Sequence, residues 1–250
     1  MNGFVVVPWA SSTARGGHRG CCQMSAVQPR RDFLKLASLV SASAFVGPVA
    51  AAGNTEVAIF AGGCFWCMEK PYDVLPGVKS TTSGYCGGNE KNPTYKAVGS
   101  GKTGHAESMR VEYDPSQVSY EQLLDVFWHN IDPTTVNKEF CDTGKQYRTA
   151  IFYLNEEQKI AALASKKRYE ESNVFGKKIV TEISPAKTFW EAEDYHQDYY
   201  KKNPQLYAFY RANCGRDRYL ESIWGESGSS FSITDIPSAV KQRLSKPNSD

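Results

Sequence analysis

The hydrophobic positions of residues 53–225 predict alternating strands and helices. Runs rich in β-branched and aromatic residues predict strands at 56–60, 78–84, 106–113, 147–154 and 178–184. Helices are predicted after Cys64, from Ser119 to about Asn130, and from Asn155 onward, the last with Ile160, Ala161, Leu163, Ala164 and Tyr169 facing inward. This alternation predicts one α+β or α/β domain, a two-layer, ferredoxin-like sandwich whose mixed sheet is covered by helices. Residues 85–104 read as a long functional loop, and the C-terminal segment as irregular.

The strand at 106–113 raises a question about Glu107. Met109, Val111 and Tyr113 lie on one face of this strand, and Glu107 falls on the same apolar side. If the strand extends that far, the carboxyl is desolvated and its protonated form is favoured. If the strand begins later, the side chain is solvated. Alternation alone does not choose between these two readings.

The two ends of the chain do not read as part of this domain. Within 24–52, Arg30-Arg31 precede an apolar, small-residue run that ends in Ala50-Ala51-Ala52, which is the pattern of an export signal. The arginine pair resembles a twin-arginine signal and predicts export to a bacterial periplasm. A membrane anchor is the alternative, but serines and Gly47-Pro48 make the run a poor span. Residues 1–23 read as an unstructured extension or a misassigned start, and 226–250 as a flexible tail.

Composition excludes some partners. The formal charge of +2, from 29 basic and 27 acidic residues, is too weak to indicate nucleic acid binding. The hydrophobic fraction of 41% among 250 residues suffices for a sizeable core. With no heptad pattern, we expect a monomer that does not associate with a membrane once the signal is removed.

The segment Gly62-Gly63-Cys64-Phe65-Trp66-Cys67 carries the most chemical information. It joins a predicted strand to a predicted helix, so Cys64 would lie at a helix N-terminus, where a thiolate is favoured. The adjacent Phe65 and Trp66 suggest an apolar recess beside the sulfur. A zinc site or inert buried thiols are alternatives, but no second CxxC or zinc-finger histidine pair accompanies this one.

Several stretches in sequence order together resemble the A-type peptide methionine sulfoxide reductases. The likeness runs from about Val57 to Trp224. The stretches that carry it are Gly63-Cys64-Phe65-Trp66, Asn92-Pro93-Thr94-Tyr95, Gly104-His105-Ala106-Glu107, Asp142-Thr143-Gly144-Lys145-Gln146-Tyr147-Arg148, Glu193-Asp194-Tyr195-His196-Gln197 and Asn203-Pro204.

The resemblance implies a role for each matching residue. Cys64 would attack the sulfur of methionine S-sulfoxide, free or in peptides, and Glu107 would protonate the departing oxygen. The hydroxyls of Tyr95 and Tyr147 would orient that oxygen. Phe65 and Trp66 would enclose the substrate methyl group, and Asp142 would help place the substrate or a water.

The resemblance also implies a sulfenic acid on Cys64 that condenses with a second thiol. Cys67 is favoured because closing a short ring needs no loop movement, and Cys214 is its rival. Cys86 and Cys141 are weaker candidates for the second thiol, because their neighbours suggest packed loops. No bound cofactor or metal is implied, and an external dithiol donor such as a thioredoxin-like protein, exported or membrane-linked, would reset the disulfide.

Two other functions fit parts of the sequence. A thioredoxin-like disulfide exchanger would use Cys64-Phe65-Trp66-Cys67 and would not need Glu107, Tyr95 or Tyr147. An exported methionine-binding module would use the aromatic recess without chemistry.

Overall fold

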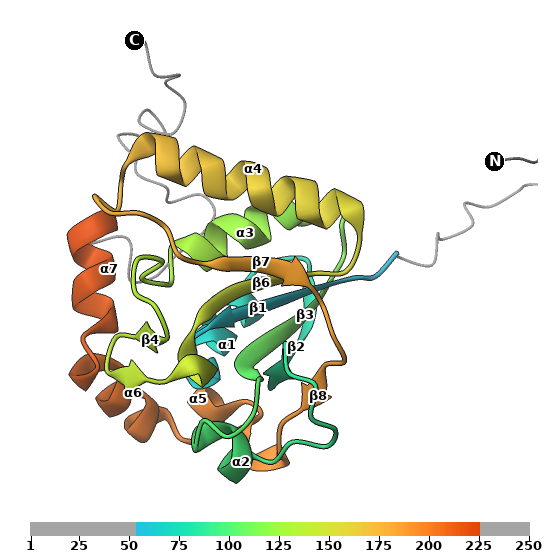
Figure 1. Ribbon diagram of the computed structural model, residues 1–250, viewed down its shortest axis with the longest axis vertical. Helices are drawn as coiled ribbons and strands as arrows, with labels where there is room; N and C mark the ends of the chain where they lie inside the picture. Colours follow the sequence, from blue (N-terminus) through green and yellow to red (C-terminus); the bar gives the residue numbers. More distant parts are fainter. Residues whose placement is uncertain (1–53, 226–250) are drawn as a thin grey trace, which may run out of the picture. The chain divides into compact units, whose positions relative to one another are not determined.

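A mixed sheet of six strands, in the order β7-β6-β1-β3-β2-β8, organises the part of the chain that the structure describes (Figure 1). The computed structural model describes residues 54–225. The predictions made for 1–23, 24–52 and 226–250 lie outside these residues. The strands of this sheet are β1 (Glu56–Gly62), β2 (Val78–Cys86), β3 (Ala106–Tyr113), β6 (Thr149–Tyr153), β7 (Glu182–Pro185) and β8 (Trp190–Glu191).

The remaining elements are helices, two short 3-10 turns and one small hairpin. The helices are α1 (Phe65–Asp73), α2 (Tyr95–Gly99), α3 (Tyr120–Trp128), α4 (Glu156–Ser172), α5 (Tyr199–Lys202), α6 (Pro204–Asn213) and α7 (Arg216–Trp224). The 3-10 turns are η1 (Lys145–Tyr147) and η2 (Asp194–His196), and the hairpin pairs β4 (Lys138–Glu139) with β5 (Asp142–Thr143). Among residues 54–225, no helix is long and apolar enough to cross a membrane.

The sheet is mixed, as predicted. β6 and β7 are parallel, whereas the other neighbouring strands run antiparallel. Ala58 and Phe60 of β1 and Met109 and Val111 of β3 pack with residues of α1, α3, α4 and α7 in one large core. The other face of the sheet holds a smaller cluster that includes Ile59. The prediction of a sheet covered by helices is therefore confirmed.

Local signals explain where several elements begin. Ser119 caps α3 with the predicted capping box, in which Gln122 reaches back to the Ser119 N–H. Asn155 caps α4 by accepting from the Gln158 N–H. Phe127 and Trp128 of α3 are core residues.

The predicted inward face of α4 is only partly correct. Tyr169 is buried and Ala161 packs against the core, as predicted, but Ile160, Leu163 and Ala164 are exposed. Ile160 is 61% exposed, and the buried residues of this helix are Gln158, Ala162, Ser165 and Tyr169. Polar partners inside the fold explain the rotation. The Ser165 hydroxyl accepts from the indole N–H of Trp128 at 2.8 Å, and the Gln158 amide donates to the carbonyl of Val57. A hydrophobic pattern cannot show such buried polar contacts.

Three other boundaries differ from the prediction. β2 extends through the fully buried Tyr85 and Cys86, and α2 forms within the predicted loop after Thr94 caps its first turn. The strand predicted at 178–184 begins only at Glu182, because Val180 donates instead to the carbonyl of Pro133. The helices α5, α6 and α7 had no counterpart in the predicted elements.

Candidate active site

The turn between β1 and α1 places Cys64 at the N-cap of α1. Gly63 has φ +77°, and a Cβ there would lie 2.4 Å from the Cγ of Glu139. Only glycine fits this position without displacing a buried side chain. The turn leaves Cys64 just 6% exposed. The predicted strand–turn–helix placement of Cys64 is confirmed.

Glu107 points inward from the start of β3. It lies on the same face as Met109 and is 2% exposed. One carboxylate oxygen accepts a hydrogen bond of 3.1 Å from the backbone N–H of Phe65, the residue after Cys64. Burial raises the pKa of Glu107 to about 8; Asp142 and Cys67 add to this, and the Phe65 N–H opposes it. The structure thus decides between the two readings of Glu107, and the carboxyl is mostly protonated at neutral pH.

Tyr95 and Tyr147 converge on the same place from two different segments. Tyr95 begins α2, Tyr147 ends η1, and both side chains are partly buried. Burial raises the pKa of Tyr95 to about 12, with Glu107 and Cys64 the next causes. Burial likewise raises the pKa of Tyr147, followed by Glu107, Tyr95, Asp142 and Cys64. Both phenols therefore remain protonated and can donate hydrogen bonds beside Cys64 and Glu107.

Cys64 and Cys67 form a hydrogen-bonded thiol pair in the first turn of α1. Burial raises the pKa of Cys64 well above its usual value, and its contact with Cys67 and the charges of Glu107 and Asp142 raise it further. The hydrogen bond from Cys64 lowers the pKa of Cys67 to about 7. The pair therefore releases one proton readily and holds the second firmly. Burial thus opposes a thiolate on Cys64 alone, and the pair with Cys67 is what makes a thiolate available in this turn.

The two aromatic residues after Cys64 have different environments. Phe65 is almost completely buried, with ring centroids 4.9 Å from His196 and 6.4 Å from Tyr95. Trp66 is partly exposed and stacks on Tyr199 at 3.8 Å, while its indole N–H donates to His196 Nδ1 at 3.0 Å. Trp66 is thus the ring of the predicted recess that a substrate can reach more easily.

Asp142 lies in β5 and accepts a short hydrogen bond of 2.5 Å from the Tyr210 hydroxyl. Burial raises the pKa of Asp142, while Tyr210 and Arg216 oppose the rise. Its charge contributes to the raised pKa values of Cys64, Glu107 and Tyr147. The structure thus places Asp142 near Cys64, Glu107 and Tyr147, the residues with which the family resemblance grouped it.

Comparison with known proteins agrees with this constellation. Residues 56–228 match the family model for peptide methionine sulfoxide reductase. The chain belongs to this family. The peptide methionine sulfoxide reductase MsrA of Bacillus velezensis is 52% identical over 169 residues, covering 68% of this chain and 96% of that protein. The protein of the same name from Bacillus subtilis is 51% identical over 170 residues, with the same coverage of 68% and 96%.

Solved structures give the same result. Methionine sulfoxide reductase A of Corynebacterium diphtheriae is 36% identical, with a TM-score of 0.58 over 62% of this chain and 77% of that one. Mxr1 of Saccharomyces cerevisiae in reduced form is 34% identical, with a TM-score of 0.58 over 62% of this chain and 88% of that one. The fold of residues 54–225 is therefore that of this reductase family.

The other cysteines of this reductase depart from expectation. Cys141 and Cys214 form a disulfide, so Cys214, the predicted rival of Cys67, already has a partner. Cys141 is exposed in the turn between β4 and β5, which corrects its predicted place in a packed loop. Cys86 is fully buried in β2, and its thiol donates to the carbonyl of Lys187. Among residues 54–225 the free thiols are those of Cys64, Cys67 and Cys86.

Several residues around the reductase site had no role assigned from the sequence. Glu193 accepts from the Tyr85 hydroxyl and from the Tyr95 N–H, which fixes the start of α2. His196 and Tyr199 pack on Trp66. The likeness of residues 193–197 to the family could have indicated Glu193 and His196. Tyr210 and Tyr199 carry no comparable signal, because they lie in short helices that the hydrophobic pattern did not predict.

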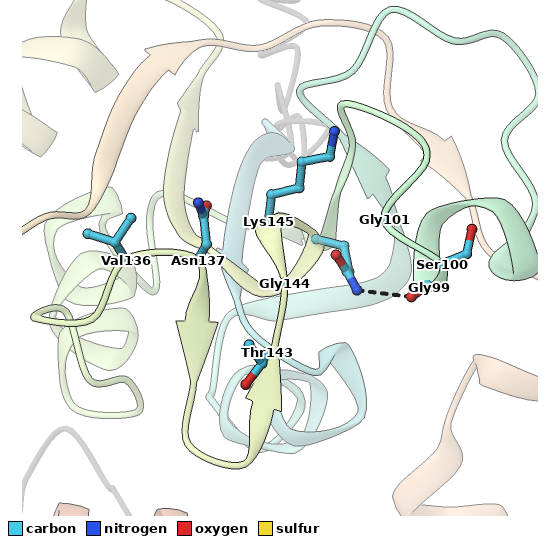
Figure 2. A pocket seen from close by; sticks show the side chains of 9 residues that line it. Gly99, Ser100, Gly101, Val136, Asn137, Thr143, Gly144 and Lys145 are labelled. Atoms are coloured by element: carbon cyan, nitrogen blue, oxygen red, sulfur yellow. Dashed lines mark hydrogen bonds between the residues drawn. The ribbon is translucent and has the colours of Figure 1, made fainter.

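An open hollow of about 650 Å³ lies beside the segments that carry Tyr95 and Tyr147, although neither tyrosine lines it. Figure 2 shows it between the loop that follows α2 and the strands of the β4–β5 hairpin, with the Gln146 amide donating to the carbonyl of Gly99. Its lining consists of Gly99, Ser100, Gly101, Val136, Asn137, Thr143, Gly144, Lys145 and Gln146. Because Tyr95 begins α2 and Tyr147 follows Gln146, the hollow borders the elements that carry both tyrosines.

Proposed function

We propose that Cys64 is the thiol that attacks methionine S-sulfoxide in this peptide-methionine (S)-S-oxide reductase. The activity follows from membership of the family. The observation that supports the assignment is the buried Glu107 carboxyl bound to the N–H next to Cys64. It provides an acid, protonated near neutral pH, close to the attacking sulfur.

In the first step, the proton that Cys64 and Cys67 share moves to Cys67. The Cys64 thiolate then forms a bond to the sulfoxide sulfur, and the S–O electron pair moves to oxygen. Glu107 gives its proton to that oxygen, which would otherwise be a very poor leaving group. The hydroxyl passes to Cys64, which becomes a sulfenic acid as methionine leaves. Cys64 is thereby oxidised by two electrons and the sulfoxide is reduced by two.

Tyr95 and Tyr147 hold the oxygen during this step. Both phenols are protonated, and both interact electrostatically with Glu107 and Cys64. Each can therefore donate a hydrogen bond to an oxygen placed between the thiol and the acid. Such donors stabilise the charge that develops on the oxygen during attack. Trp66 encloses the substrate methyl group, and Asp142 helps to place the substrate.

Cys67 then resolves the sulfenic acid. Its thiolate attacks the Cys64 sulfur, the hydroxyl leaves as water after taking up a proton, and a Cys64–Cys67 disulfide forms. Three observations support Cys67: its hydrogen bond with Cys64, its pKa of about 7, and the engagement of Cys214 with Cys141. A thioredoxin-like dithiol protein then returns the pair to the reduced state.

The open hollow supports protein-bound methionine sulfoxide as a substrate. Its lining offers backbone groups of three glycines and their neighbours and the exposed side chain of Val136, which suit an extended polypeptide. It borders the elements that carry Tyr95 and Tyr147. We therefore assign it to the residues that flank the oxidised methionine.

We also propose that the protein is exported through the twin-arginine route to a bacterial periplasm. The signal-like pattern of 24–52 is one support. An exposed disulfide between Cys141 and Cys214 is a second, since such bonds persist in oxidising compartments. Fractionation of cells that express the full chain tests this, and recovery of the protein in the cytoplasm with reduced Cys141 and Cys214 would reject it.

The assignment of Cys64 and Glu107 is tested with residues 53–225, methionine S-sulfoxide and dithiothreitol. Methionine formation is measured for the wild type, Cys64→Ser and Glu107→Gln. We expect no product from the first variant and little from the second. Because Glu107 has no part in simple disulfide exchange, Glu107→Gln should retain that reaction. A wild type that forms no methionine but catalyses disulfide exchange would indicate a thioredoxin-like function instead. Equal loss of both reactions in Glu107→Gln would show that Glu107 supports the fold rather than acting as the acid.

A further inference from the structure

Arg216 is a buried cation directly beneath the turn that carries Cys64. It is the first residue of α7 and is 2% exposed. Its Nη2 donates to the carbonyl of Gly62 at 2.9 Å, and its Nη1 donates to the carbonyl of Asn130 and to the Met68 sulfur. One guanidinium therefore connects the end of β1, the segment after α3, and α1.

The charge of this guanidinium has no carboxylate partner within ion-pair distance among residues 54–225. The carboxyl of Glu139 is fully buried nearby, and burial raises its pKa well above the usual range although Arg216 and the Asp132 N–H oppose the rise, so burial disfavours the anion that would compensate Arg216. The plane of the guanidinium packs on Phe140 at 4.5 Å. Arg211, by contrast, pairs with Asp217 while it donates to the carbonyl of Cys67.

An unpaired buried charge is costly to the folded state. A functional reason for keeping the Arg216 charge would be that it stabilises a negative charge on a neighbouring group. The thiol pair is that neighbour, because Arg216 lowers the pKa of Cys67. The charged and titratable groups that face the pair are the carboxyls of Glu107 and Asp142, the guanidiniums of Arg211 and Arg216, and the phenols of Tyr95, Tyr147, Tyr207 and Tyr210. Burial raises the pKa of each phenol, so the phenols carry no charge near neutral pH. With Glu107 protonated and Arg211 paired, Arg216 is the cation available to offset Asp142.

We propose that Arg216 is a positioning residue that fixes the Gly62–Cys64 turn and supplies the unpaired positive charge that stabilises a thiolate in the Cys64–Cys67 pair. The proposal rests on the proposed function of Cys64 as the attacking sulfur. It explains how a thiol pair that is buried and faces a carboxylate can still react near neutral pH. The disulfide between Cys141 and Cys214 supports the arrangement, because it links the two segments that carry Phe140 and Arg216.

The test measures the pH dependence of alkylation of Cys64 and Cys67 by iodoacetamide, mapped by mass spectrometry. Arg216→Met should raise the apparent pKa of the pair by about one unit or more and slow alkylation at neutral pH about tenfold. Arg216→Lys keeps the charge and should retain most of the wild-type pKa. Arg211→Met is the matched control, and its shift should be clearly smaller. An unchanged pKa in Arg216→Met, or a shift in Arg216→Lys or Arg211→Met as large as that in Arg216→Met, would overturn the proposal.

Glu139→Gln keeps the test decisive if Arg216→Met does not fold. If Glu139 is neutral, this replacement removes no charge and should leave the pKa of the thiol pair unchanged. A fall in that pKa would show that Glu139 is an anion already compensating Arg216, which contradicts the proposal. Alkylation needs no sulfoxide, so these results are independent of whether Cys64 reduces methionine sulfoxide.

Discussion

The two cysteine pairs of this reductase lie close to the same carboxylate, Asp142, but in opposite environments. Cys64 and Cys67 are buried free thiols in the first turn of a helix. Cys141 and Cys214 form a disulfide between a hairpin turn and the end of α6. The first pair is surrounded by groups that control protons, whereas the second joins two segments of chain.

In the proposed mechanism, this difference means that proximity to the site does not by itself make a cysteine part of the chemistry. The reactive pair has an acid, Glu107, and a buried cation, Arg216, within its immediate surroundings. The disulfide has neither. Its place beside Asp142 and Tyr210 instead indicates that it holds the site's rim in position. The predictions below separate the two roles.

The largest effect is expected for Cys64→Ser. The serine hydroxyl is a far weaker nucleophile than a thiolate, so the rate of methionine formation should fall by more than about 10³-fold. Cys86→Ser is the matched control, because Cys86 is also buried but lies outside the thiol pair. Comparable loss in the control would indicate a folding defect rather than loss of the nucleophile.

Glu107→Gln should lower kcat about 10²-fold or more and change its pH dependence. The reaction needs the Cys64–Cys67 pair to lose its first proton, for which the pKa of Cys67 is about 7, and it needs a protonated Glu107, whose pKa is about 8. Activity should therefore rise through pH 7 and fall above pH 8. In the variant the alkaline fall should disappear, and a persistent fall in the pH profile would assign it to another group.

The two pairs should respond differently to serine substitution. Cys67→Ser should still produce about one methionine per enzyme in a first turnover, but cycling with a thioredoxin-like donor should slow at least about tenfold. The double replacement of Cys141 and Cys214 by serine should keep turnover within about twofold. Its cost should appear as a loss of about 2–4 kcal/mol in the free energy of unfolding, measured with denaturant. The reverse pattern would make Cys141 and Cys214 the reactive pair.

The smallest effect concerns the hollow beside the site. Val136→Asp should raise KM for a peptide that contains methionine sulfoxide about threefold and leave KM for free methionine sulfoxide unchanged, because only the peptide loses apolar contact. Ile160→Asp is the control, since this residue is similarly exposed on α4. An equal effect on both substrates would place the peptide elsewhere.

The sequence predicted the strand–turn–helix at Cys64, the strand of Glu107 and both site tyrosines, since each has a local pattern or a family motif. It could not predict the inward face of α4, where Ser165 and Gln158 are buried through hydrogen bonds to distant residues. It also could not show that Cys141 reaches Cys214, because no local pattern records a contact across 73 residues. It could not show that burial raises the pKa of Cys64, because burial depends on the whole fold.

One measurement tests the central claim that Cys64 and Cys67 carry the sulfur chemistry alone. The enzyme is prepared with Cys141–Cys214 oxidised and the other thiols reduced, then given one equivalent of methionine S-sulfoxide without any external reductant. Mass mapping of the disulfides follows. The account predicts a new Cys64–Cys67 bond beside an intact Cys141–Cys214 bond. A bond from Cys64 to Cys141 or Cys214 would contradict it.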